Sequence, residues 1–273
     1  AVRQVIADFA LDAEKTSEGW QLERTLELLN PKTLESLVSD AAKLELSTLD
    51  LHWSLGSTNT FVQNLSLEAN FHGYACMAER QTAGKGRRGS NWVSPFGKNI
   101  YLSVGWKIPT SVSLDGLSLA IGCAVARAIK AQNETVEVTL KWPNDILIEG
   151  GKTAGILVEL ASGDAGFHHL VVGVGVNLNL SRADSENIDQ AWNVVQQVSR
   201  NKLAASLLSE LVDCLVVFRR DGFAPFQREW NELDAFAGLE VDLISAGKTD
   251  SGTARGVDDR GHLILEAPDG IKK

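Results

Sequence analysis

The sequence is poor in cysteine and methionine, with three cysteines and one methionine among its 273 residues. Cys76, Cys123 and Cys214 lie far apart in apolar stretches, so they give neither the close spacing of a metal site nor a disulfide framework. We expect three buried thiols in a reducing compartment, and therefore a cytoplasmic protein. Because the chain begins with Ala1 and its one methionine is Met77, we interpret it as processed or partial.

Long apolar runs and an excess of basic residues are also missing. No stretch approaches the length of a membrane span and no signal peptide opens the chain, so we expect no membrane contact. The 35 acidic and 26 basic residues give a net charge of -9, which argues against a broad nucleic-acid surface. With 44% hydrophobic residues, the chain is long enough to bury a large core in one or two domains.

The most distinctive stretch is a run of glycines and cations, here called the glycine–cation loop. Three glycines alternate with three cations in the order Gly84, Lys85, Gly86, Arg87, Arg88 and Gly89. Glycine lets the backbone approach a ligand closely, and cations donate charge-assisted hydrogen bonds to carboxylate or phosphate oxygens. This pattern predicts a loop that closes over an anionic ligand.

Two other interpretations of the loop stay open on these residues alone. Its Gly-x-Gly-x-x-Gly spacing is that of a dinucleotide-binding oxidoreductase, but that motif needs a long helix directly afterwards. Pro95 and Gly97 interrupt the next residues, and a strand pattern follows over Asn99–Val104. The plainer alternative is a solvated basic surface turn.

Polar residues also gather where strands are expected to end. Ser57–Asn59 follow a predicted strand over 48–55 and precede a helical pattern, where plain N-capping is the simple alternative. The sequence Lys-Trp-Pro-Asn-Asp over Lys141–Asp145 ends a strand over 136–141. Lys152 follows a Gly150-Gly151 hairpin turn, so we expect Lys141 and Lys152 to face one pocket. Asn177 lies in an apolar strand over 168–180, where an amide without a partner would be costly.

The remaining chain alternates predicted helices and strands. Helices are expected over 1–12, 31–38, 202–221 and 225–233, and over 114–130 with Ser113 as its cap. His168 and His169 have no ligand partners nearby and are interpreted as structural. From about Gly238 short strands with polar turns predict a small β-barrel.

Five motifs together resemble those of the biotin protein ligase family, in the family's order and spacing. They are Ser57–Asn59, Glu79–Trp92, Lys141–Asp145, Lys152–Glu159 and Gly173–Asn177. The resemblance implies an α+β fold, with a mixed sheet flanked by helices, like a class II synthetase, and a small C-terminal SH3-like β-barrel. It also implies three parts: a remnant of a winged-helix domain over 1–25, a catalytic domain over 26–234 and an incomplete SH3-like domain over 235–273.

The same resemblance implies an activity. Biotin would be activated by ATP to biotinyl-5′-AMP, with Mg2+, and transferred to a lysine of a biotin carboxyl carrier protein such as that of acetyl-CoA carboxylase. Lipoate ligases share the fold but carry a different arginine–glycine signature, which is absent here. The alternative is a biotin-sensing transcriptional repressor, although we expect no DNA binding from these residues. A homodimer stays open, because family members often pair through sheet edges.

The resemblance also assigns individual residues to roles, none of them metal ligands. Lys152, Lys141, Arg87 and Asp145 are the predicted catalytic group, with Asp145 as a base or orienting group. The predicted biotin-binding residues are Ser57, Thr58, Asn59, Gln81, Gly84, Lys85, Gly86, Arg87, Arg88, Gly89, Lys152 and Gly155. The predicted nucleotide-binding residues are Trp92, Lys141, Asn144, Asp145 and Asn177. Lys85 stands where the family commonly has arginine, which keeps the charge but loses the bidentate geometry.

Overall fold

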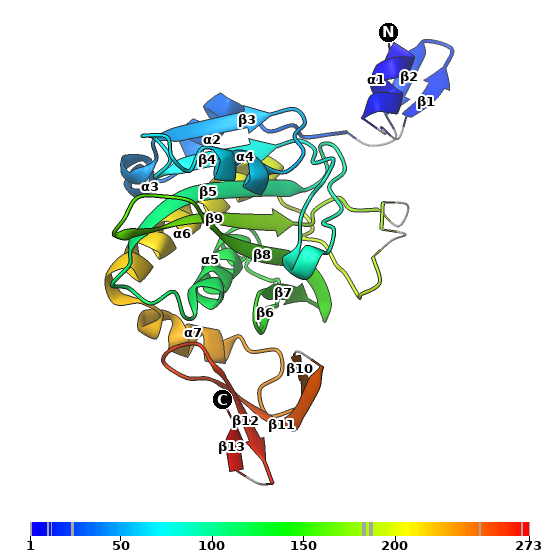
Figure 1. Ribbon diagram of the computed structural model, residues 1–273. Coiled ribbons are helices and arrows are strands. Elements are labelled where there is room, and N and C mark those ends of the chain that lie inside the picture. The colour runs from blue at the N-terminus through cyan, green and yellow to red at the C-terminus, as the bar shows by residue number, and fades with distance from the viewer. Residues whose placement is uncertain are drawn as a thin grey trace.

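The protein folds around a seven-stranded central sheet, with a smaller sheet near each end of the chain (Figure 1). The computed structural model describes residues 2–9, 11, 13–22, 25–181, 184–185, 188–245, 247–268 and 270–272. The N-terminal unit consists of α1 (Val2–Asp8) and a hairpin of β1 (Ala13–Thr16) and β2 (Gly19–Leu22). The helix expected over 1–12 therefore ends at Asp8.

The central sheet is mixed, as predicted, with the strand order β3-β4-β5-β9-β8-β7-β6. Only β3 and β4 pair in parallel, and the other neighbours are antiparallel. Its strands are β3 (Thr48–His52), β4 (Tyr74–Ala78), β5 (Ile100–Pro109), β6 (Val138–Lys141), β7 (Asp145–Ile148), β8 (Gly151–Ala161) and β9 (Phe167–Val176). Strand β9 ends at Val176, so Asn177 lies just beyond it. The apolar pattern had predicted a strand that continues to residue 180 and contains Asn177.

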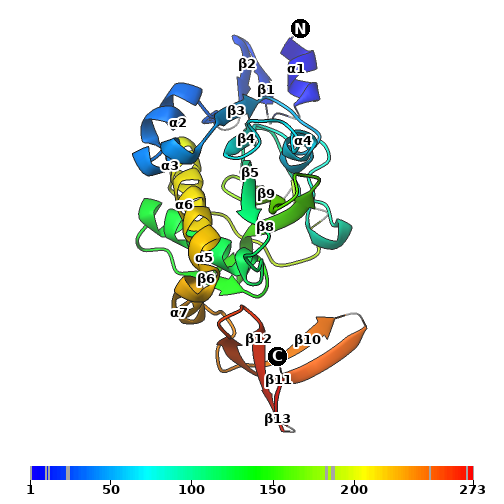
Figure 2. The same ribbon diagram turned by 60° about the vertical axis from the view of Figure 1, so that its left-hand side comes forward.

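Helices cover the two faces of this sheet unequally. Figure 2 shows α2 (Pro31–Leu37), α3 (Asp40–Glu45), α5 (Leu117–Gln132) and α6 (Arg200–Asp221) on one side. The short α4 (Thr58–Asn64) packs on the other face, against β4, β5 and β9. That face is therefore only partly covered, which leaves room there for a cleft.

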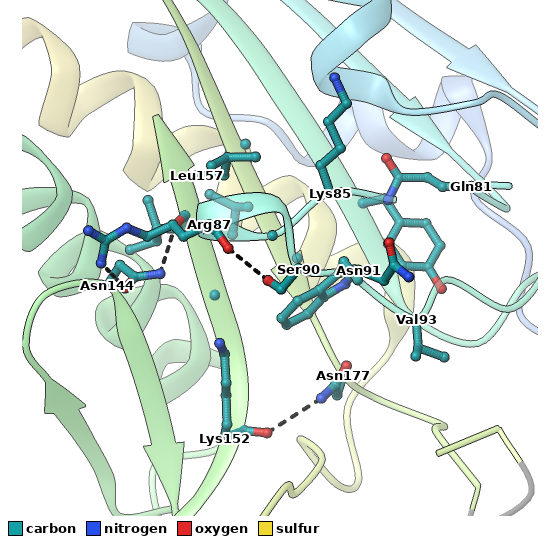
Figure 3. A pocket seen from close by; sticks show the side chains of 18 of the residues that line it. Gln81, Lys85, Arg87, Ser90, Asn91, Val93, Asn144, Lys152, Leu157 and Asn177 are labelled. Carbon is teal, nitrogen blue, oxygen red and sulfur yellow. Dashed lines mark hydrogen bonds between the residues drawn. The ribbon is translucent and has the colours of Figure 1, made fainter. Parts of the chain in front are cut away.

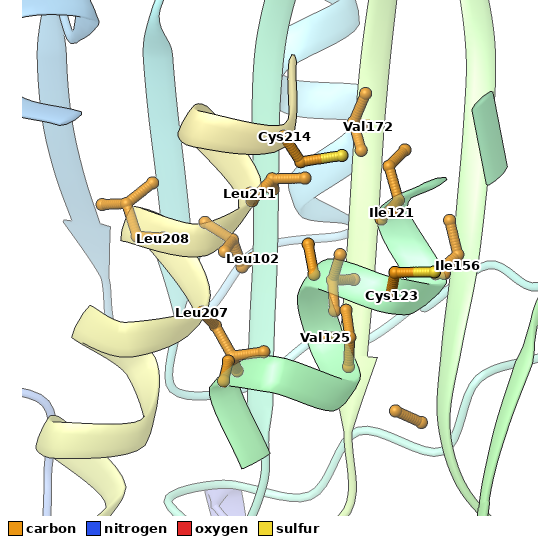
Figure 4. Packing of buried hydrophobic residues seen from close by; sticks show 14 of the residues in the cluster. Leu102, Ile121, Cys123, Val125, Ile156, Val172, Leu207, Leu208, Leu211 and Cys214 are labelled. Carbon is orange, nitrogen blue, oxygen red and sulfur yellow. The ribbon is translucent and has the colours of Figure 1, made fainter. Parts of the chain in front are cut away.

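Period-two alternation along the strands explains which residues face which side. Leu102 of β5, Ile156 of β8 and Val172 of β9 point into the main core, where Leu207, Leu208 and Leu211 of α6 meet them (Figure 4). The alternate residues Ser103, Gly155 and Gly173 belong to the opposite face, where α4 lies. A strand face lined with serine and glycine is shallow, and this shallowness makes the cleft possible.

The three cysteines are free and buried, as predicted. Burial raises the pKa of Cys76 and of Cys214 to about 12. Burial also raises the pKa of Cys123, which α5 places in the main core (Figure 4). All three thiols are therefore protonated and unreactive at neutral pH.

The start of α5 differs from the sequence prediction. Helix α5 begins at Leu117, after Gly116, and not at Leu114 after a Ser113 cap. Gly116 has a left-handed backbone with φ of 74°, and a Cβ there would lie 2.4 Å from the ring of Phe223. The Ser113 hydroxyl accepts a hydrogen bond from the N–H of Asp115, which makes a turn before the helix.

The C-terminal part is a small four-stranded antiparallel sheet in the sequential order β10-β11-β12-β13. Its strands are β10 (Glu240–Ser245), β11 (Lys248–Val257), β12 (Leu263–Ala267) and β13 (Gly270–Lys272). The turn η2 (Ala224–Phe226) and helix α7 (Gln227–Glu232) connect α6 to this sheet. None of the described helices has the length and apolar character needed to span a membrane.

Candidate active site

A cleft with a cavity volume of about 870 Å3 opens on the face of the central sheet that α4 only partly covers (Figure 3). Strands β5, β8 and β9 contribute its floor, and the turns before α4 and β7 contribute its sides. Most residues predicted for the site line it: Ser57, Thr58, Asn59, Gln81, Lys85, Gly86, Arg87, Trp92, Asn144, Asp145, Lys152, Gly155 and Asn177. Four of the predicted residues do not line the cleft: Gly84, Arg88, Gly89 and Lys141.

The first end of the cleft is a buried polar corner at the start of α4. The Oε1 atom of Gln81 accepts hydrogen bonds from the N–H of Thr58 at 2.8 Å and from its hydroxyl at 3.1 Å. The Nε2 atom of Gln81 donates to Ser94 at 3.0 Å, which fixes the amide. Ser57 makes no capping bond with its side chain, so the simple N-cap interpretation was wrong. Its hydroxyl is buried and available to a ligand.

The side-chain amide of Asn59 completes this polar corner. Its Nδ2 donates to Glu159 Oε2 at 2.9 Å, and its Oδ1 accepts from Ser103 at 2.6 Å. Gly173 must be glycine here, because a Cβ would lie 2.1 Å from Oδ1 of Asn59. Ser103 also lies 2.7 Å from the Thr58 hydroxyl, so one continuous network joins α4 to the sheet. Sequence reasoning missed Ser103, because a single small polar residue in an apolar strand carries no signal.

Trp92 forms an apolar wall over a glycine floor. A Cβ on Gly175 would lie 2.5 Å from the indole Cε2, and one on Gly155 would lie 3.0 Å from Cζ3. The indole Nε1 is buried without a hydrogen-bond partner. The ammonium of Lys152 lies 5.6 Å from the ring centroid. The indole therefore packs directly on these two glycines and beside the cation.

The second end of the cleft carries the charges. Lys152 Nζ lies 2.8 Å from Asp145 Oδ1, and the two side chains are only 17% and 15% exposed. The two groups form an ion pair, and both side chains line the cleft. The ammonium is therefore within reach of a ligand oxygen there.

The glycine–cation loop reaches across this charged end. Residues Arg87–Gly89 form the short turn η1, in which Arg88 has a left-handed φ of 54°. Arg87 Nη1 donates to Asn144 Oδ1 at 2.8 Å, and Asn144 Nδ2 donates to the carbonyl of Ile156 at 3.1 Å. Figure 3 shows Lys85 pointing away from both Arg87 and Lys152. A dinucleotide-binding motif needs a long helix after the loop. Between residues 84 and 116 the one helical element is the short turn η1, so this motif is absent.

The structure contradicts the predicted position of Lys141. Its ammonium lies 5.8 Å from the ring centroid of Phe236, outside the cleft, whereas Lys152 lines it. Strand β6 is at the edge of the sheet, and its Leu140 forms a backbone bridge with Asp234. Phe236, two residues later, contacts the ammonium of Lys141.

Asn177 supports the backbone of Lys152 from below. Its Nδ2 points to the carbonyl of Lys152 at 3.4 Å, and its Oδ1 accepts from Asn99 at 3.5 Å. The carbonyl of Asn99 accepts in turn from Arg200 Nε at 2.9 Å, and Arg200 forms a buried ion pair with Glu79. The conspicuous Glu79 of the loop motif therefore has a structural partner from α6.

A segment that sequence reasoning missed closes the charged end. Ile188, Asp189, Gln190 and Trp192 line the cleft, and the Ala191 carbonyl accepts from the N–H of Lys152 at 2.9 Å. At its start, Asp184 pairs with Lys98 at 2.8 Å. Burial alone would raise the pKa of Asp184, but hydrogen bonds from Lys98 and Ser181 hold that pKa below its ordinary value. The segment has no periodic pattern, so nothing in its sequence indicated this role.

Two family models match the chain. The biotin/lipoate A/B protein ligase family matches residues 54–177, which span the cleft from its polar corner to Asn177. The biotin protein ligase C terminal domain matches residues 238–273.

Curated relatives and solved structures agree with these models. The bifunctional ligase/repressor BirA of Escherichia coli is 36% identical over 276 residues, covering 99% of this chain and 83% of the relative. The biotin–[acetyl-CoA-carboxylase] ligase of Mycobacterium tuberculosis is 34% identical, covering 80% of this chain and 83% of the relative. The biotin protein ligase from Aquifex aeolicus in complex with biotin and ATP superimposes with a TM-score of 0.67 and 25% identity, covering 82% and 94%.

The cleft geometry, the two matched models and a relative aligned along nearly the whole chain lead to one conclusion. This protein belongs to the biotin protein ligase family.

Proposed function

We propose that the cleft binds biotin and ATP together, forms biotinyl-5′-AMP and then transfers biotin to a lysine of a carboxyl carrier protein. The observation that carries this proposal is the enclosed ammonium of Lys152, held between Asp145 and Trp92 beside a buried polar corner. A neutral polar head group suits the corner, and a carboxylate suits the ammonium. Biotin carries these two features at its opposite ends.

The polar corner is the proposed site for the biotin ring system. The hydroxyl of Ser57 and the network through Thr58, Asn59 and Gln81 offer both donors and acceptors to a ureido group. Because these side chains already hydrogen-bond one another, little ordering is needed when the ligand enters. The indole of Trp92, which packs on Gly155 and Gly175, offers an apolar surface to the chain that leads to the carboxylate.

In the first reaction a biotin carboxylate oxygen attacks the α-phosphorus of ATP. A new carboxyl–phosphorus bond forms, the bond to the bridging oxygen breaks, and pyrophosphate leaves with its electron pair. Lys152 offsets the negative charge that builds on the reacting oxygens, and Arg87 adds a second cation from the loop. Asp145 holds the ammonium in place at 2.8 Å until the substrates arrive.

Residues of the cleft would hold a magnesium ion together with the phosphates of ATP. The described residues contain no group of three or more His, Cys, Asp or Glu side chains that could hold a metal alone. The cleft offers Asp145 and Asp189, and Mg2+ is usually bound by one or two carboxylates together with substrate phosphates. This donor set fits an ion that arrives with the nucleotide. When bound, the ion offsets negative charge on the phosphates.

In the second reaction the neutral ε-amine of a carrier lysine attacks the carbonyl of the adenylate. The new amide bond forms, the bond to the phosphate oxygen breaks, and AMP leaves while the amine loses a proton. Asp145 is the proposed group that orients or accepts this proton, because it is the carboxylate nearest to Lys152. The loop and Trp92 exclude water, which would otherwise hydrolyse the mixed anhydride.

The test combines the purified chain with biotin, Mg-ATP and a carrier domain, and measures pyrophosphate release and biotin incorporation. We expect both signals, and we expect incorporation alone to disappear when the acceptor lysine of the carrier is replaced by arginine. Pyrophosphate release that does not depend on biotin would contradict the proposal.

The alternative function, a biotin-sensing repressor, has weaker support in this chain. The described residues of the N-terminal unit carry the cations Arg3 and Lys15 against the acids Asp8, Glu14 and Glu18, so they offer little to DNA phosphates. We expect no specific DNA binding by these 273 residues. A salt-dependent gel shift at sub-micromolar protein would contradict this expectation.

A further inference from the structure

The turn between β6 and β7 is held from outside by the C-terminal part of the chain. The indole Nε1 of Trp142 donates to the carbonyl of Gly261 at 3.2 Å. One residue earlier, the ammonium of Lys141 lies over the ring of Phe236. Before that, the N–H of Leu140 donates to the carbonyl of Leu233 at 2.7 Å. Three consecutive residues thus contact the C-terminal sheet or the segment that leads into it.

The contact at Gly261 is close and leaves little play. Gly261 has φ of 81°, and a Cβ there would lie 2.7 Å from the Cα of Gly116, so backbone meets backbone. Beside it, Arg260 Nε donates to Asp115 at 3.1 Å. The turn of the C-terminal sheet therefore packs against the residues just before α5. Trp142 donates its hydrogen bond to a part of this turn that is held in place.

The other side of the same β6–β7 turn faces the cleft. Asn144 accepts from Arg87 of the glycine–cation loop at 2.8 Å, and Asp145 pairs with Lys152 at 2.8 Å. Trp142 is thus only two and three residues from the two side chains that hold the cations of the cleft. A movement of its indole would be passed through Pro143 to both of them, because the short turn has few free dihedral angles.

We propose that Trp142 is a positioning residue through which the C-terminal sheet fixes Asn144 and Asp145, so that this sheet completes the charged end of the active site. The inference rests on the proposed roles of Lys152 and Arg87. It also gives Lys141, the one predicted catalytic residue that points elsewhere, a place in the same contact. The polar corner has no share in it, because its hydrogen bonds join α4 to Gln81, β5 and β8 and involve no residue of the β6–β7 turn.

The test compares Trp142→Phe with wild type. Phenylalanine keeps an apolar ring against the core but removes the N–H that Gly261 accepts. We expect kcat for pyrophosphate release to fall about tenfold and KM for ATP to rise several-fold, as expected for loss of one positioned hydrogen bond. The affinity for biotin alone should stay unchanged. A general loss of fold would weaken both substrates, so the split separates positioning from damage.

A second variant approaches the contact from the opposite side. Gly261→Ala leaves Trp142 intact but pushes the turn of the C-terminal sheet away from Gly116, and we expect the same split. The matched control is Arg255→Gln, which breaks the exposed ion pair with Glu266 inside the same sheet and leaves the contact with Trp142 untouched. We expect this control to behave as wild type.

A measurement without substrates separates this inference from the proposed reaction. Amide hydrogen exchange of residues 141–148 and 84–92 should accelerate several-fold in Trp142→Phe and in Gly261→Ala, and remain as in wild type in Arg255→Gln. Unchanged exchange in the folded variants would overturn the inference whatever their activity. Equal losses for biotin and ATP would overturn it as well.

Discussion

The two ends of the cleft are built in different ways. In the polar corner, Thr58, Asn59, Gln81 and Ser103 hydrogen-bond one another and are buried or nearly so. At the charged end each of two cations has one polar side-chain partner: Lys152 pairs with Asp145, and Arg87 donates to Asn144.

The difference follows from what each end has to do. A preformed network costs little ordering and suits a neutral group that stays the same through the reaction. Cations with exchangeable partners suit a carboxylate that becomes an anhydride and then an amide, because they can follow the charge. The predictions below test this contrast, beginning with the largest expected effect.

Lys152→Ala should abolish adenylate formation and leave the fold intact. Loss of one charge-assisted contact in an enclosed site should lower the rate by at least about 100-fold, or roughly 3 kcal/mol of barrier. The measurement is biotin-dependent pyrophosphate release. Lys107→Ala is the matched control, since it removes the same side chain from β5 at a position outside the cleft, where Lys107 pairs with Asp164, and should keep most of the activity. Similar losses in both variants would contradict the assignment.

Gly173→Ala should break the polar corner and spare the charged end. The new Cβ would lie 2.1 Å from Asn59 Oδ1, so the amide must leave its place between Ser103 and Glu159. We expect biotin affinity to fall by roughly 10- to 100-fold, or about 1–3 kcal/mol, as for a disrupted buried network, with ATP affinity little changed. Titration calorimetry with each substrate measures both.

The control for this variant is Gly122→Ala, at a helix position where a Cβ would meet Leu140 at an ordinary 3.6 Å. It should bind biotin as wild type does. A Gly173→Ala variant with normal biotin affinity would show that the corner is not the biotin site.

Arg87→Gly should permit adenylate formation but weaken its retention. Lys152 remains at the carboxylate, whereas the loop loses its bond to Asn144 and gains a flexible residue. We expect biotinyl-5′-AMP to dissociate about tenfold faster, which is the effect of about 1.4 kcal/mol. The released adenylate should then acylate lysines of nearby proteins without carrier specificity.

Arg88→Gly makes a matched comparison for the loop. It removes the same charge and adds the same residue, but Arg88 does not line the cleft and its left-handed backbone favours glycine. Its release rate should stay close to that of wild type. Equal rates of biotinyl-5′-AMP release in wild type, Arg87→Gly and Arg88→Gly would contradict a role of the loop in retaining the adenylate.

Asp184→Asn should have the smallest effect, and only on stability. The pKa of Asp184 in the folded protein lies below its ordinary 3.8 because Lys98 and Ser181 donate hydrogen bonds to it, although burial acts in the opposite direction. A lowered pKa stabilises the fold at pH values above 3.8, and this contribution is lost as the pH falls through the folded value. We expect the free energy of unfolding of the variant to be lower by about 1 kcal/mol at neutral pH. Denaturant titrations should show the difference narrowing below pH 3.8, and a constant difference would contradict this origin.

The sequence predicted the parts of the site that lie in short motifs with a distinctive set of residues. The glycine–cation loop, the turn at Ser57–Asn59 and Lys152 after its hairpin are each local patterns, and the structure brings them to one cleft. The mixed sheet flanked by helices was implied by the family that these motifs resemble. In these places the local chemistry and the fold agree.

The predictions failed where the position of a residue depends on contacts with segments far away in the sequence. Lys141 contacts Phe236, more than 90 residues later, and no local pattern contains that contact. Ser103 gave no signal because one serine in an apolar strand is ordinary, and its role arises only when α4 packs on β5. The segment at Ile188–Trp192 was missed because it is an irregular loop, and its backbone is fixed by pairing with Lys152.

The most direct test of the contrast between the two ends is amide hydrogen exchange with and without biotinyl-5′-AMP. The account predicts little change for residues 57–61 of the polar corner, which is already ordered, and strong new protection for Gly84–Gly89. Matching protection at both ends, or none in the glycine–cation loop, would contradict a preformed corner facing an adaptable charged end.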